Sequence, residues 1–147
     1  MMKIKLLFLI LFTSIVNQIT IAQTINGDTL ITKSGLKYIP IKRGDGPRPW
    51  PGQKVSIFYS VRFVNAKKIF DSNKGEDPFK FKLGKGEVIP GLDEGIYLMH
   101  TNGKMKFIIP SQLAYGKMGK PNPEGSPRYL VPPNTDLIYE VELVDIH

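Results

Sequence analysis

The chain has 147 residues, a formal net charge of +7, 41% apolar and 22% charged residues, which fits one globular domain with a tail. The absence of cysteine excludes disulfides, zinc–thiolate sites, iron–sulfur clusters and a thiol nucleophile. With two histidines, at positions 100 and 147, we expect neither a metal centre nor a cofactor.

Residues 1–22 differ in character from the rest of the chain. Lys3 and Lys5 precede an unbroken apolar run, Leu6–Phe12, and Thr20–Ala22 places small residues where a signal peptidase cleaves. This order is typical of a secretory signal peptide. The alternative is a membrane anchor, but a spanning helix needs about 20 mainly apolar residues and polar residues interrupt this run. We therefore expect cleavage after residue 22, no stable membrane span afterwards, and an exported protein that is periplasmic or secreted.

The remaining chain divides into a short polar tether, residues 23–33, and one domain, residues 34–147. Several segments of the domain alternate apolar and polar residues, a pattern typical of half-buried strands. The clearest is 55–63, in which every second residue is apolar. The predicted strands are 36–42, 55–63, 79–83, 105–109 and 137–143.

One segment has the spacing of a helix. Leu92, Ile96 and Met99 stand at i, i+4 and i+7, Pro90 fits a first helical turn, and Gly103 is a natural stop. Strands without alternating helices favour an α+β fold, with an antiparallel sheet covering a single helix. The segment 117–133 carries five prolines and no periodicity, and a loop of that length in a compact domain is usually functional.

Sequence motifs for bond-making chemistry are missing. Asp71–Gly75 resembles the start of a calcium loop, but its glycine is one place early and its twelfth position is Lys82. There is no phosphate-binding loop and no Gly-x-Ser-x-Gly. The basic residues are scattered rather than grouped, so we expect no nucleic-acid partner. These absences leave a binding module or an enzyme that makes and breaks no bonds.

From about residue 35 onward the chain resembles the FKBP-type peptidyl-prolyl cis–trans isomerases, in order and at family-like spacing. The family fold implies a bent antiparallel sheet, with about five strands expected here, wrapped around one short α-helix. The resemblance rests on four groups of segments: Val55–Tyr59 with Phe70–Ser72, Pro78–Gly91, Ile108–Pro110 with Leu113–Gly116, and Val131–Thr135 with Leu137–Leu143.

The resemblance implies a site for X–Pro segments of unfolded or partly folded proteins, and also for macrolide inhibitors. Taken singly, an aromatic residue on a strand face is more often part of the core, so only the joint agreement supports a pocket. The implied catalytic residues are Tyr59, Asp71, Ile89 (through its backbone N–H) and Tyr115. The implied substrate-binding residues are Phe70, Phe79, Val88, Leu92, Leu130, Val131 and Tyr139.

Two departures from the family pattern bear on this site. Leu92 stands where many relatives have a tryptophan, so the pocket floor stays apolar but loses a large flat surface, and macrolide affinity is expected to fall. The segment 120–129 is longer than in the minimal family domain. No dimerisation region precedes the domain, so we expect a monomer. The alternative function is a catalytically weak binding module or holdase for proline-containing segments.

Overall fold

The computed structural model describes residues 28–123 and 129–147. The predicted signal peptide, residues 1–22, lies outside these ranges, as does the first part of the predicted tether. Within the described ranges, no helix is long and apolar enough to cross a membrane.

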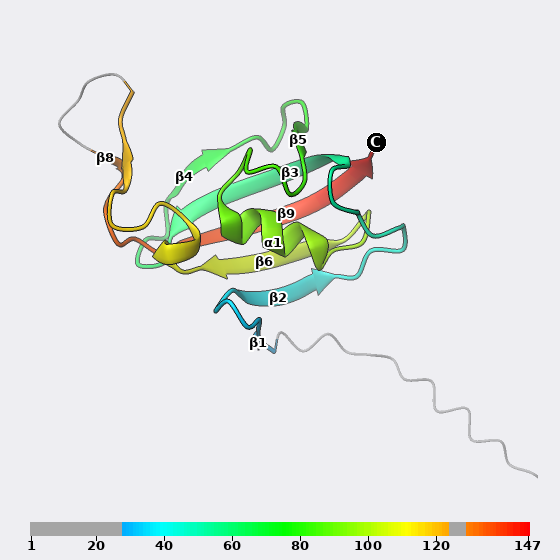
Figure 1. Ribbon diagram of the computed structural model, residues 1–147, viewed down its shortest axis with the longest axis horizontal. Helices are drawn as coiled ribbons and strands as arrows, with labels where there is room; N and C mark the ends of the chain where they lie inside the picture. The colour runs from blue at the N-terminus through cyan, green and yellow to red at the C-terminus, as the bar shows by residue number, and fades with distance from the viewer. Residues whose placement is uncertain (1–27, 124–128) are drawn as a thin grey trace, which may run out of the picture.

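An antiparallel sheet of seven strands forms the body of the molecule (Figure 1). The strand order is β1–β2–β6–β9–β3–β4, and β5 also pairs with β3. The fold prediction of an antiparallel sheet with one helix is therefore confirmed. The strands of this sheet are β1 (Leu30–Ile31), β2 (Lys37–Lys42), β3 (Lys54–Phe63), β4 (Ile69–Ser72), β5 (Phe79–Lys82), β6 (Lys104–Ile109) and β9 (Leu137–Ile146).

The two longest strands, β3 and β9, are paired within the sheet, and their register shows that its two faces differ in polarity. Val61 faces Tyr139 in the pairing register, and both are buried, whereas the neighbouring pair of Ser60 and Glu140 belongs to the opposite face. Because side chains alternate along a strand, one face of the sheet is apolar and the other polar. The apolar face carries the core.

The helix α1 (Pro90–Tyr97) lies across the apolar face of the sheet (Figure 1). Pro90 occupies the first turn as predicted, where its missing N–H costs no hydrogen bond. The helix ends at Tyr97, well before Gly103, because the N–H groups of Leu98 and Met99 bond three residues back and tighten the last turn. Met99 nevertheless lies in the core.

Four short strands lie outside the five segments that alternation predicted as strands. β1 comes from the predicted tether, and β4 is the strand that carries Asp71. A separate two-stranded sheet of β7 (Lys120–Pro121) and β8 (Tyr129–Val131) forms within the segment predicted as a loop. Strands of two to four residues are too short for alternation to be recognised in the sequence.

Two glycines bring the helix close to the sheet. Gly95 faces the ring of Phe107 on β6, and a Cβ added to it would lie 2.8 Å from that ring. Gly91, one turn earlier, faces Ile109 on the same strand at an even closer approach. Residues four apart share a face of a helix, so both glycines point at β6 and leave no room for a side chain.

We expect Gly95→Ala to destabilise the protein although alanine favours helices. Alanine gains about 1 kcal/mol of helix propensity. Overpacking a filled core costs about 1–3 kcal/mol, so the net change is a loss of about 1 kcal/mol. Denaturant unfolding measures it, with the exposed Lys85→Ala as a control expected to change by less than about 0.5 kcal/mol. An unchanged or increased stability of Gly95→Ala would show that the helix can move away from Phe107.

Candidate active site

A cavity of about 280 Å³ opens where the start of α1 approaches β3, β4, β5 and β9. These segments are far apart in the sequence, and the sheet brings them to one place. The residues that line the cavity are Tyr59, Asp71, Phe79, Glu87, Val88, Ile89, Leu92, Tyr115, Lys120 and Tyr139.

Aromatic rings form the walls of this cavity. Tyr59 lies between Phe79, at 6.1 Å and nearly perpendicular, and Tyr139, at 5.9 Å between ring centroids. Tyr139 and Leu92 are buried, whereas Phe79 is 41% exposed and stands at the opening. The cavity thus has aromatic walls and polar groups in its lining, with Leu92 among its buried residues.

Tyr59 and Asp71 form the main polar pair of the site. The Tyr59 hydroxyl donates to Asp71 Oδ2 at 3.1 Å. Burial, followed by the negative charge of Asp71, raises the pKa of the Tyr59 phenol from its ordinary value of 10 to about 12. Burial likewise raises the pKa of Tyr139. Both phenols therefore stay protonated at neutral pH, and the single O–H of Tyr59 is directed at Asp71.

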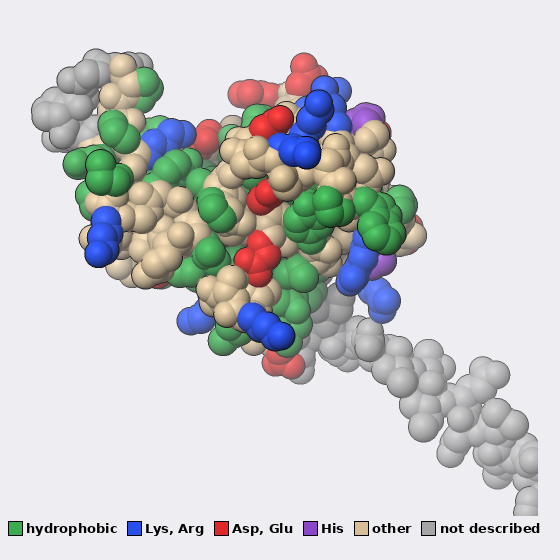
Figure 2. Space-filling model, in the orientation of Figure 1, with side chains coloured by type: hydrophobic (Ala, Val, Ile, Leu, Met, Phe, Trp, Pro, Cys, Tyr) green, Lys and Arg blue, Asp and Glu red, His purple; other side chains and the backbone are tan. Residues whose placement is uncertain are grey.

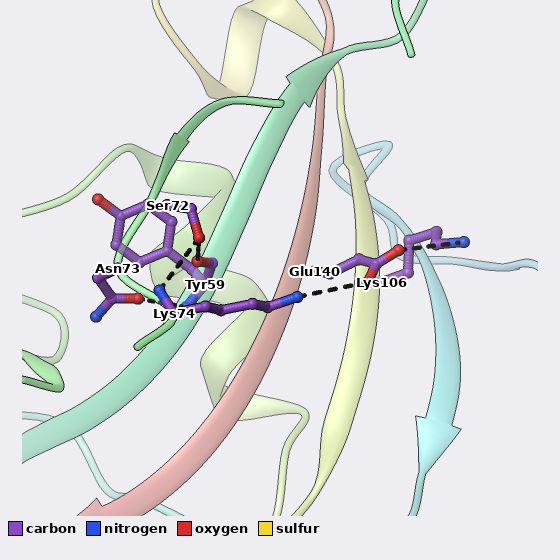
Figure 3. A network of polar contacts seen from close by, with 6 residues as sticks. All are labelled: Tyr59, Ser72, Asn73, Lys74, Lys106 and Glu140. Carbon is purple, nitrogen blue, oxygen red and sulfur yellow. Dashed lines mark hydrogen bonds and ion pairs between the residues drawn. The ribbon is translucent and has the colours of Figure 1, made fainter. Parts of the chain in front are cut away.

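A group of polar contacts holds the segment after β4 against β3 (Figure 3). The buried Asn73 accepts from the Tyr59 N–H at 2.7 Å and donates to the Ile57 carbonyl at 3.0 Å, while Ser72 Oγ donates to the Tyr59 carbonyl. Next in the chain, Lys74 reaches across the polar face to Glu140. These bonds fix Tyr59 from both sides of its backbone and hold the segment that follows Asp71.

Two hydrogen-bond donors at the cavity have no acceptor within the described part of the chain. One is the N–H of Ile89, the residue before the first turn of α1, whose carbonyl is already bonded into the helix. The other is the hydroxyl of Tyr115, which follows the 3₁₀ helix η1 (Ser111–Leu113). Both residues line the cavity, so both donors are available to a bound carbonyl group.

Glu87 and Lys120 also line the cavity, and sequence reasoning did not include them in the site. Glu87 accepts from the Lys82 N–H at 2.9 Å. The Lys120 ammonium lies 5.5 Å from the centre of the Tyr115 ring, within the range of a cation–π contact. Strand β7, which places Lys120, is too short to have been found from its pattern.

Three of the substrate-binding residues implied by the resemblance do not line the cavity. Phe70 stacks on Phe63 at 4.6 Å and packs against the core. Val131 is buried and pairs with Lys120, and Leu130 beside it is 38% exposed. Contact of these three residues with a substrate stays a prediction.

Replacing Asp71 should lower the pKa of Tyr59. Asp71→Asn removes the charge but leaves the burial, so we expect a midpoint below about 12 that remains above 10. The pKa of Tyr59 is higher in the folded protein than in the unfolded chain. The contribution of Tyr59 to the free energy of unfolding is therefore complete below pH 10 and is lost as the pH rises through 12. NMR titration of labelled tyrosine rings measures the midpoint, with Asp45→Asn as control. An unchanged Tyr59 midpoint in Asp71→Asn would contradict the assigned cause.

Solved structures share this fold. The chain is similar to the crystal structure of AtFKBP13 (TM-score 0.73, 35% identity, covering 82% of this chain and 99% of that one). It is also similar to FkpA from Escherichia coli (TM-score 0.69, 34% identity, covering 84% of this chain and 53% of that one).

Curated relatives agree with the structures. The chain is 37% identical over 113 residues to "Peptidyl-prolyl cis-trans isomerase Fkbp12" of Drosophila melanogaster, covering 76% of this chain and 98% of that protein. It is 45% identical over 105 residues to "FK506-binding protein 4" of Emericella nidulans, covering 71% of this chain and 20% of that protein. The chain spans only 20–28% of the length of three such longer relatives. Residues 46–144 match the family model described as FKBP-type peptidyl-prolyl cis-trans isomerase, and the chain belongs to this family.

Proposed function

We propose that this protein catalyses cis–trans isomerisation of X–Pro peptide bonds. The observation that carries the proposal is the cavity itself, in which aromatic walls surround two available donors, the Ile89 N–H and the Tyr115 hydroxyl. Unaided, X–Pro bonds isomerise over tens to hundreds of seconds, which is slow enough to limit folding. The names of family members support this activity.

The reaction needs no bond to be made or broken. Its barrier of about 18–20 kcal/mol is the loss of amide resonance when the C–N bond twists. A twisted amide has lost part of its carbonyl polarity, so a dry cavity stabilises it relative to the planar amide that water solvates well. In this chain Tyr59, Phe79, Leu92 and Tyr139 supply the apolar walls.

The donors act on the carbonyl as it rotates. The Ile89 N–H is held by the start of α1, and Tyr115 is held by the turn after η1, so neither must reorganise during the reaction. Asp71 does not touch the amide in this mechanism. It is a positioning residue, because it orients the Tyr59 hydroxyl and keeps that ring in the wall.

The cellular role we propose is the folding of exported proteins by a monomer. Support comes from the sequence of residues 1–22, which has the order of a secretory signal. N-terminal sequencing of the protein from its native cells should begin at Gln23. A sequence that begins at residue 1 or 2 would contradict cleavage of a signal peptide.

Isomerase activity is tested by measuring the exchange rate of an X–Pro peptide by NMR with catalytic amounts of the protein. We expect clear acceleration that falls by about tenfold in Tyr115→Phe, since a lost transition-state hydrogen bond is worth about 1.4 kcal/mol. Tyr38→Phe is the matched control, because Tyr38 packs against the core outside the cavity and should keep full activity.

A second candidate function is binding of proline-containing segments without useful turnover. It is favoured by the exposed apolar side chains of the segment beside the cavity, where Met118 is 80% and Tyr129 49% exposed. Saturable peptide binding by a folded protein that leaves the exchange rate unchanged would replace the isomerase proposal with this one.

A further inference from the structure

A second and larger cavity, of about 400 Å³, lies at the opposite end of α1. It opens between the end of β2, the loop that follows β2, and the segment from the end of α1 into β6. Leu92 lines the first cavity and Leu98 lines the second, so about 9 Å along the helix axis separates these two residues. None of the residues that line this second cavity lines the first.

The inner surface of the second cavity is apolar. Pro40, Leu98 and Met105 are half-buried there, and Met99 is fully buried. A volume of about 400 Å³ falls in the range of roughly 300–1,000 Å³ that small-molecule sites occupy. The cavity can therefore take an apolar group of limited size.

The opening of this cavity is basic. Lys42, Arg43 and Arg48 all line it, and none of the ion pairs found in the described ranges involves any of them. Asp45, in the loop after β2, does not line the cavity. Its carboxylate accepts from Asn102 at 2.8 Å, and this bond and, to a smaller extent, the charge of Lys42 lower the pKa of Asp45. Figure 2 shows Lys and Arg side chains grouped beside hydrophobic ones at this end of the molecule.

His100 holds one of these cations at the opening. Arg48 donates from Nε to His100 Nε2 at 3.0 Å, and an arginine nitrogen cannot accept. The imidazole therefore carries its proton on Nδ1, which donates to the Gly46 carbonyl at 2.9 Å. This arrangement uses Nε of Arg48 and leaves the terminal N–H groups of its guanidinium available to an anion.

We propose that this second cavity binds a small carboxylate with an apolar body, such as a medium-chain fatty acid or an aryl carboxylate. The apolar body lies against Leu98, Met99 and Met105, and the carboxylate meets Arg48 and Lys42 at the opening. A neutral apolar molecule would leave the cations without a role, and a cation would be repelled. The proposal concerns a different site from the X–Pro cavity and does not rest on isomerase activity.

Octanoate is the test ligand. Octanol and octylammonium, which have the same chain length, serve as the neutral and cationic comparison compounds. Amide NMR of the purified protein follows the site, since Gly44, Met99, His100 and Gly103 report the second cavity and Tyr59 and Ile89 report the first. We expect saturable shifts of the first group by octanoate, at lower concentration than with octanol and without matching shifts of Tyr59 and Ile89. Octylammonium should not bind there.

Charge-removing variants test the role of the cations. Arg48→Gln and Lys42→Gln should each weaken octanoate binding about three- to fivefold, the upper part of the range for an exposed charge contact. Lys37→Gln, at the other end of β2, removes the same charge and should leave binding unchanged. All three residues are exposed, so the variants should fold. Four outcomes would each overturn the proposal. They are equal affinity for octanol and octanoate, unchanged octanoate affinity in Arg48→Gln, shifts confined to the first cavity, and no saturable shift at all.

Discussion

The close approach of α1 to β6 determines where both cavities of this molecule lie. Gly91 and Gly95 let the helix backbone lie against Ile109 and Phe107, with no side chain between. A larger residue at either position would lift the helix from the sheet, because a close-packed core has no space to absorb it. The start of the helix then brings Ile89 to the aromatic cavity, and the residues after its end bring Met99 and His100 to the basic one.

The second structural requirement is the attachment of β4 to β3. Asn73 is buried and bonds to the backbone of three other residues, so its loss would leave buried groups without partners, at about 1–3 kcal/mol for each. Those bonds surround the backbone of Tyr59 and lie two residues from Asp71. The orientation of the Tyr59 hydroxyl therefore depends on an amide side chain that never reaches the cavity.

These two features differ in how far they could be predicted from the sequence. The long strands and the helix have strong periodicity. Four residues that the resemblance implied for the site, Tyr59, Ile89, Leu92 and Tyr115, do line the cavity. Asn73 carries no such signal, because its role depends on backbone groups of another strand. Lys120 could not be predicted as a cavity residue for a similar reason. A two-residue strand within a proline-rich segment has no recognisable pattern, and the pairing of Lys120 with Val131 places Lys120 at the cavity.

The two ends of the helix offer chemically different sites. At the first, Asp71 and Glu87 face one cation, Lys120, around an aromatic hollow that suits an uncharged amide. At the second, three cations surround an aliphatic hollow. Because the walls differ in charge and in shape, a carboxylate and a proline segment would not compete for one place. The glycine contacts that fix α1 on β6 also oppose movement of the helix, so occupation of one cavity should leave the other unchanged.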